Sequence, residues 1–181
     1  MGSEALSNRG NWQYGANRTG KKGEDGFAAA IDDCLPEYYT VVNKPAKFAL
    51  YSDGKGVALD TYIINNITNK SILVEVKSGN RGGNAHERAY KYLSEGMRKT
   101  LRGKDLTLVE DSVFFVFSGS TFSGKNKFIC WSKKRTSKYE VDPQKYRDEL
   151  AICLPSHLYE ITDASFLNIE DIAKKIRNLL E

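Results

Sequence analysis

Apolar residues follow two different spacings along this sequence, and each spacing predicts a different secondary structure. Residues 24–35 and 168–180 carry apolar side chains three and four positions apart, which is the spacing of one helix face. Residues 56–66 and 71–78 are apolar segments rich in β-branched side chains, and residues 66–70 between them have turn composition. We therefore predict two amphipathic helices and a β-hairpin.

The remaining apolar segments predict a layered fold. Further strands are predicted at residues 38–44, 48–52, 112–120, 127–132 and 157–162. The run at 112–120 is continuously apolar, which is typical of a strand that is buried on both faces. A helix is predicted from about 85 to 102, and residues 142–154 begin like a helix. Asn168 is the predicted N-cap of the last helix. Strands that alternate with helices indicate an α/β fold, with a mixed central β-sheet flanked by helices.

Length and composition place these elements in one domain. The 181 residues suit a single domain spanning 1–181, in which the polar, glycine-rich residues 1–22 are predicted to form an N-terminal arm. No apolar run in the sequence is long enough to cross a membrane, and the first residues lack the apolar core of a signal peptide. We therefore expect a soluble cytoplasmic protein without a membrane partner. Cys34, Cys130 and Cys153 are widely spaced, and they predict neither a zinc site nor a disulfide framework.

Positive charge is concentrated in two segments of a chain whose formal net charge is +4. Residues 125–138 hold six basic residues and no acidic residue, and Phe128 and Trp131 lie among them. A second group lies in the N-terminal arm. A solvated surface would explain either segment alone, but together they indicate contacts with nucleic acid phosphates. The residues predicted to contact a DNA backbone are Lys125, Lys127, Lys133, Lys134 and Arg135.

The predicted strand at 71–78 carries two charged residues within an apolar segment. Because alternate residues of a strand share a face, Glu75 and Lys77 point the same way. Asp60, in the other half of the hairpin, is placed to reach Glu75. Two adjacent carboxylates repel each other, and a divalent cation such as Mg²⁺, which prefers oxygen ligands, removes that repulsion. The alternative interpretation is a structural ion pair on an edge strand.

The three charged residues predict phosphodiester hydrolysis if they meet around Mg²⁺. A metal-bound water loses its proton more readily, and the metal polarises a phosphoryl oxygen. Lys77 would position or deprotonate that water and offset the charge that develops on phosphorus. Glu24, in the first predicted helix, is a further candidate carboxylate beside the metal, and helix capping is its alternative role.

The segment "GGNAHERAYKYL" (82–93), which follows the strand "LVEVK", makes a family resemblance specific. Together with Asp60, these segments resemble the EcoRI–MunI branch of type II restriction endonucleases, within the PD-(D/E)xK nuclease superfamily. The resemblance implies a restriction-endonuclease-like (PD-(D/E)xK) fold. It also implies that Asp60, Glu75 and Lys77 are the catalytic residues. The implied ligands of Mg²⁺ are Asp60, Glu75 and Val76.

The same resemblance implies which residues read DNA. These residues are Arg81, Asn84, Ala85, Glu87 and Arg88. Asparagine can bind adenine N6 and N7 together, and arginine reads acceptor edges in the major groove. Asn84 and Arg88 are four residues apart and therefore share a helix face, and Glu87 would bridge the readers across a dimer. Arg81 lies one residue further from Asn84 than the corresponding arginine of the branch, so the flanking base pair stays open.

The function implied by the resemblance is that of a homodimeric, Mg²⁺-dependent type II restriction endonuclease. It would cut double-stranded DNA at a short palindrome with an AATT core, leave 5′ overhangs and need no organic cofactor. Two alternatives remain at this point. A structure-specific endonuclease of the resolvase or repair type would share the catalytic strand. A non-catalytic DNA-binding module would keep the charged strand only as an ion pair.

Overall fold

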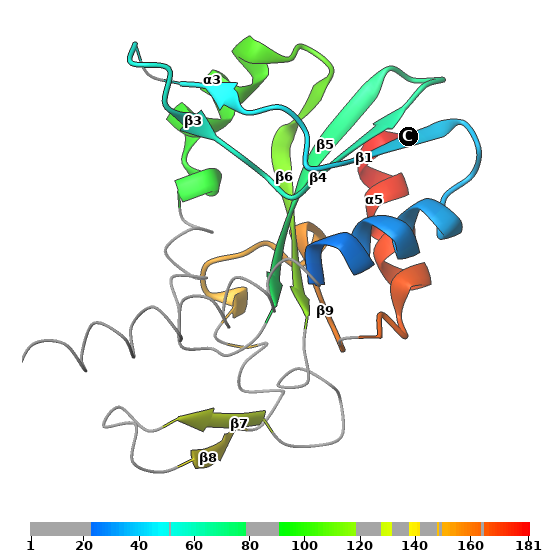
Figure 1. Cartoon of the computed structure of the whole chain (residues 1–181), viewed down its shortest axis with the longest axis vertical. Helices are drawn as coiled ribbons and strands as arrows, with labels where there is room; N and C mark the ends of the chain where they lie inside the picture. The colour runs from blue at the N-terminus through cyan, green and yellow to red at the C-terminus, as the bar shows by residue number, and fades with distance from the viewer. Residues whose placement is uncertain are drawn as a thin grey trace, which may run out of the picture.

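The structure is a computed structural model (Figure 1). It describes residues 23–50, 52–78, 91–118, 128–131, 138–141, 148, 150–163 and 165–181. Within those ranges, no helix combines the length and the apolar character that crossing a membrane requires.

A five-stranded mixed sheet forms the centre of the molecule. Its strands are, in spatial order, β1 (Tyr39–Asn43), β4 (Thr61–Asn65), β5 (Lys70–Ser78), β6 (Leu108–Ser118) and β9 (Tyr159–Thr162). Neighbouring strands are antiparallel from β1 to β5 and parallel from β5 to β9. The antiparallel and parallel halves of the sheet therefore meet at β5. The predicted mixed central sheet is confirmed.

Helices cover both faces of this sheet. The helix over residues 23–34 and helix α5 (Ile169–Leu180) lie on one face, and helix α3 (Glu95–Lys104) lies on the other (Figure 1). Strand β6 sends Phe114 toward the pair of helices and Phe115 toward α3, and both side chains are buried. The prediction that this strand is buried on both faces, and that helices flank the sheet, is therefore confirmed.

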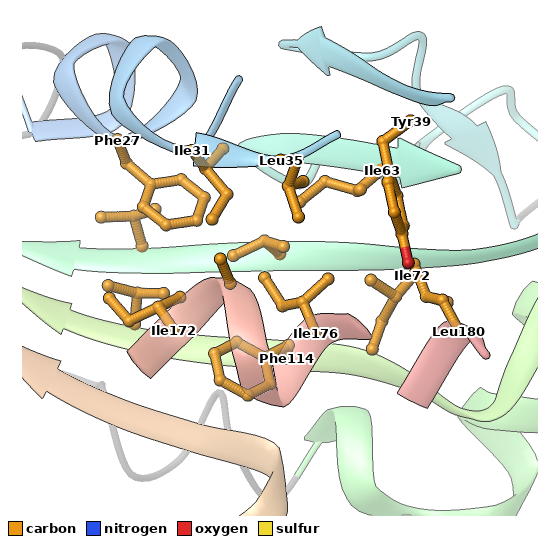
Figure 2. Close-up of a cluster of buried hydrophobic side chains, with 14 of the residues drawn as sticks. Phe27, Ile31, Leu35, Tyr39, Ile63, Ile72, Phe114, Ile172, Ile176 and Leu180 are labelled. Atoms are coloured by element: carbon orange, nitrogen blue, oxygen red, sulfur yellow. The ribbon is translucent and has the colours of Figure 1, made fainter. Parts of the chain in front are cut away.

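Figure 2 shows the core between the sheet and the pair of helices. Phe27 and Ile31 come from the helix over 23–34, and Ile172 and Ile176 come from α5; all four are fully buried. They pack with residues of β4, β5 and β6 from the sheet below. The two predicted amphipathic helices are confirmed, because their periodic apolar residues fill this core.

The predicted hairpin is confirmed, with β4 and β5 antiparallel to each other. The side-chain oxygen of Asn65 accepts hydrogen bonds from the N–H groups of Ile67 and Thr68 at 2.9 and 3.3 Å, which closes the turn. Asn69 has a φ of 55°, a left-handed conformation that asparagine adopts more readily than most residues. The register of the hairpin is thus fixed by the turn chemistry of its sequence.

The first strand of the hairpin is shorter than the predicted strand at 56–66. Residues Gly56–Val57 (β3) pair instead with Phe48–Ala49 (β2), and a Cβ on Gly56 would collide with the Phe48 carbonyl oxygen. Strand β4 begins only at Thr61. Asp60 therefore lies just outside the ladder, where its carboxylate as well as its backbone bonds to β5.

The prediction of one helix at 85–102 is wrong at Ser94, where the described part of this segment is divided into two helices. A helix ends at Leu93, and α3 begins after Ser94, whose ψ of 135° is extended backbone. The Ser94 hydroxyl accepts a hydrogen bond from the N–H of Met97 at 3.3 Å and so acts as an N-cap. Serine favours such caps over helix interiors, and this local preference overrode the apolar periodicity.

The prediction that Asn168 caps the last helix is confirmed for its position and wrong for its side-chain hydrogen bond. Asn168 occupies the N-cap position of α5, but its side chain makes no capping hydrogen bond. Its Nδ2 donates instead to the carbonyl oxygen of Ile161 at 2.9 Å. The asparagine therefore ties the start of α5 to β9, an interaction between elements that the local sequence does not reveal.

A separate two-stranded sheet pairs β7 (Phe128–Trp131) with β8 (Lys138–Val141). The strand predicted at 127–132 is confirmed by β7, whereas β8 was not predicted. Of the helix predicted at 142–154, the structure describes residues 148 and 150–154. Residues 148, 150 and 151 are helical, and the chain turns at 152–154, so this helix ends earlier than predicted.

The buried face of α5 supports a test of the core. Ile176→Ala should lower the free energy of unfolding by about 2–5 kcal/mol, because it removes buried methyl groups and leaves a cavity between α5 and the sheet. Ile152→Ala is the matched control, since Ile152 is 83% exposed and its truncation should change stability by less than about 0.5 kcal/mol. Urea unfolding of both variants measures the difference, and equal stability would contradict the described packing.

Candidate functional site

The structure brings the three charged residues predicted from the sequence together. Glu75 and Lys77 lie on β5, on the same face as Leu73, which packs into the core beneath α3. Glu75 is buried, with 2% of its surface exposed, and the side chain of Lys77 is 19% exposed. The Lys77 ammonium donates a hydrogen bond to Glu75 Oε1.

Asp60 is held against β5 by hydrogen bonds from both its backbone and its side chain. Its N–H donates to the Val74 carbonyl oxygen at 3.1 Å, and its own carbonyl oxygen accepts from the N–H of Lys44 at 2.8 Å. Its Oδ2 accepts from the N–H of Val76 at 2.6 Å. These bonds fix both the position of Asp60 and the direction of its carboxylate.

The pKa of Asp60 reflects both burial and a second carboxylate nearby. Burial and then the nearby charge of Glu75 raise the pKa of Asp60 to about 7, and Glu24 adds a smaller contribution in the same direction. The hydrogen bond from Val76 and the charge of Lys77 act against this rise in pKa without cancelling it. A carboxyl group whose pKa is raised in this way, directly before the first residue of a sheet strand, is a candidate functional group.

The residues at this position fit a Mg²⁺ ion by their chemistry. Mg²⁺ is commonly held by one or two carboxylates together with waters and substrate phosphate. Asp60 and Glu75 supply two carboxylates, and Val76 between Glu75 and Lys77 has a carbonyl oxygen that can serve as a main-chain ligand. In the described part of the chain, no group of three His, Cys, Asp or Glu residues is placed to hold a metal.

Further charged residues lie at the edge of the site. Glu24 and Asp25 belong to the helix over 23–34, and the Nζ of Lys44 lies 3.9 Å from Glu24 Oε2 and 2.6 Å from Asp25 Oδ1. Sequence reasoning identified Glu24 as a candidate but missed Asp25 and Lys44. Lys44 is the last residue of the predicted strand at 38–44 and Asp25 lies in the predicted helix at 24–35, but neither belongs to a motif, so no sequence signal pointed to a role at this site.

The remaining predicted site residues lie outside the described residues. The predicted DNA readers Arg81, Asn84, Ala85, Glu87 and Arg88 belong to this group, as do the predicted phosphate contacts Lys125, Lys127, Lys133, Lys134 and Arg135. The first of the predicted readers in the sequence, Arg81, follows Ser78, the last residue of β5, by three positions.

The fold and this site define a mixed α/β protein with a candidate two-carboxylate cation site on its central sheet. No family model matches the chain, and no curated protein matches its sequence. Among solved structures, the chain is similar to the MunI restriction endonuclease in complex with cognate DNA, at 17% identity and a TM-score of 0.47. The similarity covers 87% of this chain and 94% of that one. A likeness this low establishes neither a family nor an activity.

The raised pKa of Asp60 predicts how the stability of the metal-free protein depends on pH. The folded state holds the Asp60 proton more tightly than the unfolded state, so this stability is present below the ordinary pKa of 3.8 and is lost as pH rises toward 7. Asp60→Asn should therefore raise the melting temperature at about pH 8 by on the order of 5 °C, and much less at about pH 4.

Millimolar Mg²⁺ should raise the melting temperature of the unsubstituted chain at about pH 8, because the cation offsets the repulsion between Asp60 and Glu75. Asp60→Asn should reduce this response. Asp53→Asn, in the exposed turn between β2 and β3, is the control and should keep it. Thermal melts at both pH values measure these effects, and an Mg²⁺ response that Asp60→Asn leaves intact would argue against a cation at this site.

Proposed function

We propose that this chain is a Mg²⁺-dependent endonuclease that hydrolyses phosphodiester bonds of double-stranded DNA. The observation that carries the proposal is the convergence of Asp60, Glu75 and Lys77 on β5, with the pKa of Asp60 raised to about 7 by burial and by Glu75. Two crowded carboxylates and an adjacent ammonium are costly in a stable core, and they match the needs of metal-assisted phosphate chemistry.

Each residue has a definite part in the proposed reaction. Asp60 and Glu75 would hold Mg²⁺, with the Val76 carbonyl as a further ligand. When bound, Mg²⁺ supplies a polarised phosphoryl oxygen and a more acidic water. The Lys77 ammonium, hydrogen-bonded to Glu75, is placed to orient the attacking water and to offset negative charge that develops on the phosphoryl oxygens. Val76, through its N–H, keeps the Asp60 carboxylate turned toward the site.

The finer proposal is a homodimeric type II restriction endonuclease that reads a palindrome with an AATT core and leaves 5′ overhangs. The sequence motif at 83–88 supports it, because the motif begins five positions after the last residue of the charged strand and contains residue types that read adenine and guanine edges. A twofold dimer would match a palindromic site with one active site on each strand. The five basic residues between 125 and 135 would contact phosphates.

A non-catalytic DNA-binding module is a second candidate. The ion pair between Lys77 and Glu75 favours it, since such a pair can exist for structural reasons alone. A digest of long, mixed-sequence duplex DNA with and without Mg²⁺ separates the candidates. Discrete fragments that need Mg²⁺ support the restriction endonuclease, and uncut DNA supports the module. Cuts confined to branched or damaged DNA support a structure-specific nuclease instead.

Removing the Glu75 charge should abolish cleavage. Glu75→Gln keeps the size of the side chain, so DNA binding measured in Ca²⁺ should stay within about threefold, while the cleavage rate falls by at least about a thousandfold. Lys77→Met should behave alike. Glu95→Gln, which neutralises a carboxylate of the exposed Lys99–Glu95 pair on α3, is the matched control and should cleave normally. A Glu75→Gln protein that still cuts at the normal rate would exclude this site.

Arg88 tests the proposed reading of bases. Arg88→Ala should weaken binding to the cleaved sequence by about 1–3 kcal/mol and leave binding to unrelated DNA nearly unchanged, because a base contact carries specificity and a phosphate contact does not. Competition binding at fixed salt measures the ratio of the two affinities. A uniform loss of affinity for all sequences would instead make Arg88 a phosphate contact.

A further inference from the structure

Lys44 connects three parts of the molecule at the edge of the candidate site. It follows the last residue of β1, Asn43, and its backbone N–H donates to the Asp60 carbonyl oxygen at 2.8 Å. Its Nζ donates to Asp25 Oδ1 at 2.6 Å. Asp25 belongs to the helix over 23–34. The lysine therefore links this helix and the end of β1 to the residue that would hold the metal.

The backbone of Lys44 is in an uncommon conformation. Its φ is 52°, in the left-handed region that residues other than glycine, asparagine and aspartate seldom adopt. Pro45 follows it and narrows the allowed conformations further. Such backbone persists only where surrounding contacts hold it, and it is common at functional sites. The two hydrogen bonds to Asp60 and Asp25 are contacts of that kind.

The side chain of Lys44 is held as a cation among carboxylates. The hydrogen bond to Asp25 raises the pKa of Lys44, and the charges of Asp25, Glu24 and Asp60 add to this rise against the opposing effect of burial. Asn43 Nδ2 donates to the same Asp25 oxygen at 3.0 Å. Asp25, which accepts the hydrogen bond from Lys44, is thus itself held in place by Asn43. The position of the Lys44 ammonium near Asp60 is electrostatically favourable.

We propose that Lys44 is a positioning residue for the metal site. Its side chain, anchored on Asp25, maintains the left-handed backbone that presents its N–H to the Asp60 carbonyl, and this holds the Asp60 carboxylate beside Glu75. The inference rests on the proposed function, because that proposal assigns the binding of a divalent cation to Asp60 and Glu75. If Lys44 had only a structural role, its substitution would change the stability of the protein and leave the metal affinity of the folded protein unchanged.

Titration of the DNA-free protein with Mn²⁺ by calorimetry tests this role without relying on activity. Lys44→Met keeps the aliphatic stem and removes the ammonium, and it should weaken Mn²⁺ binding about tenfold. Lys44→Arg keeps the ion pair with Asp25 and should retain most of the affinity. Lys55→Met is the matched control, because it removes a lysine paired with Asp53 at 2.9 Å in the exposed turn between β2 and β3.

A double-mutant cycle tests whether the anchor acts through Asp25. Asp25→Asn should weaken Mn²⁺ binding about as much as Lys44→Met, and the double variant should be little worse than either one. In cleavage assays, Lys44→Met should lower kcat and leave KM for DNA nearly unchanged, because the lysine acts on the metal ligand and not on DNA affinity.

The outcomes separate this inference from the proposed function. A folded Lys44→Met protein that binds Mn²⁺ within about twofold of the unsubstituted chain overturns the positioning role. If Lys44→Met does not fold, Asp25→Asn decides the same question in the same titration. If Glu75→Gln abolishes Mn²⁺ binding while both of these variants retain it, only the role of Lys44 fails. An unsubstituted chain that binds no Mn²⁺ overturns the proposed function and this inference together.

Discussion

The hydrogen bond from the Val76 N–H to the Asp60 carboxylate is the interaction on which the candidate site depends. It holds one acidic group against a strand that already carries a second one, Glu75, in a largely buried place. The cost of this arrangement is visible in the pKa of Asp60, which burial and Glu75 raise to about 7. This cost is the basis of our proposal that a divalent cation binds between Asp60 and Glu75.

The sheet makes this arrangement possible because its two halves meet at β5. The antiparallel half delivers Asp60 from the start of β4 to one side of β5. The parallel half pairs the other edge of β5 with β6, where Glu75 lies opposite Phe115. A functional group on a central strand is held more precisely than one on a loop, and metal-assisted chemistry requires such precision.

Residues outside the sheet complete the surroundings of Asp60. The helix over 23–34 brings Glu24 and Asp25 to the end of β1, and Lys44 links them to Asp60. The same helix buries Phe27 and Ile31 in the core that α5 also fills. The packing of this helix and the position of Asp60, the proposed metal ligand, are therefore connected through Lys44.

The sequence by itself determined the elements whose signals are local. Apolar periodicity predicted the helices at 24–35 and 168–180, turn composition predicted the hairpin, and strand alternation placed Glu75 and Lys77 on one face. Only the tertiary structure decided that the strand breaks before Asp60, that Ser94 divides a helix, and that Lys44 reaches both Asp25 and Asp60. Periodicity records which face of an element is buried, but contacts between residues distant in sequence depend on how the elements pack. The burial that raises the pKa of Asp60 arises from this packing, and no local pattern encodes it.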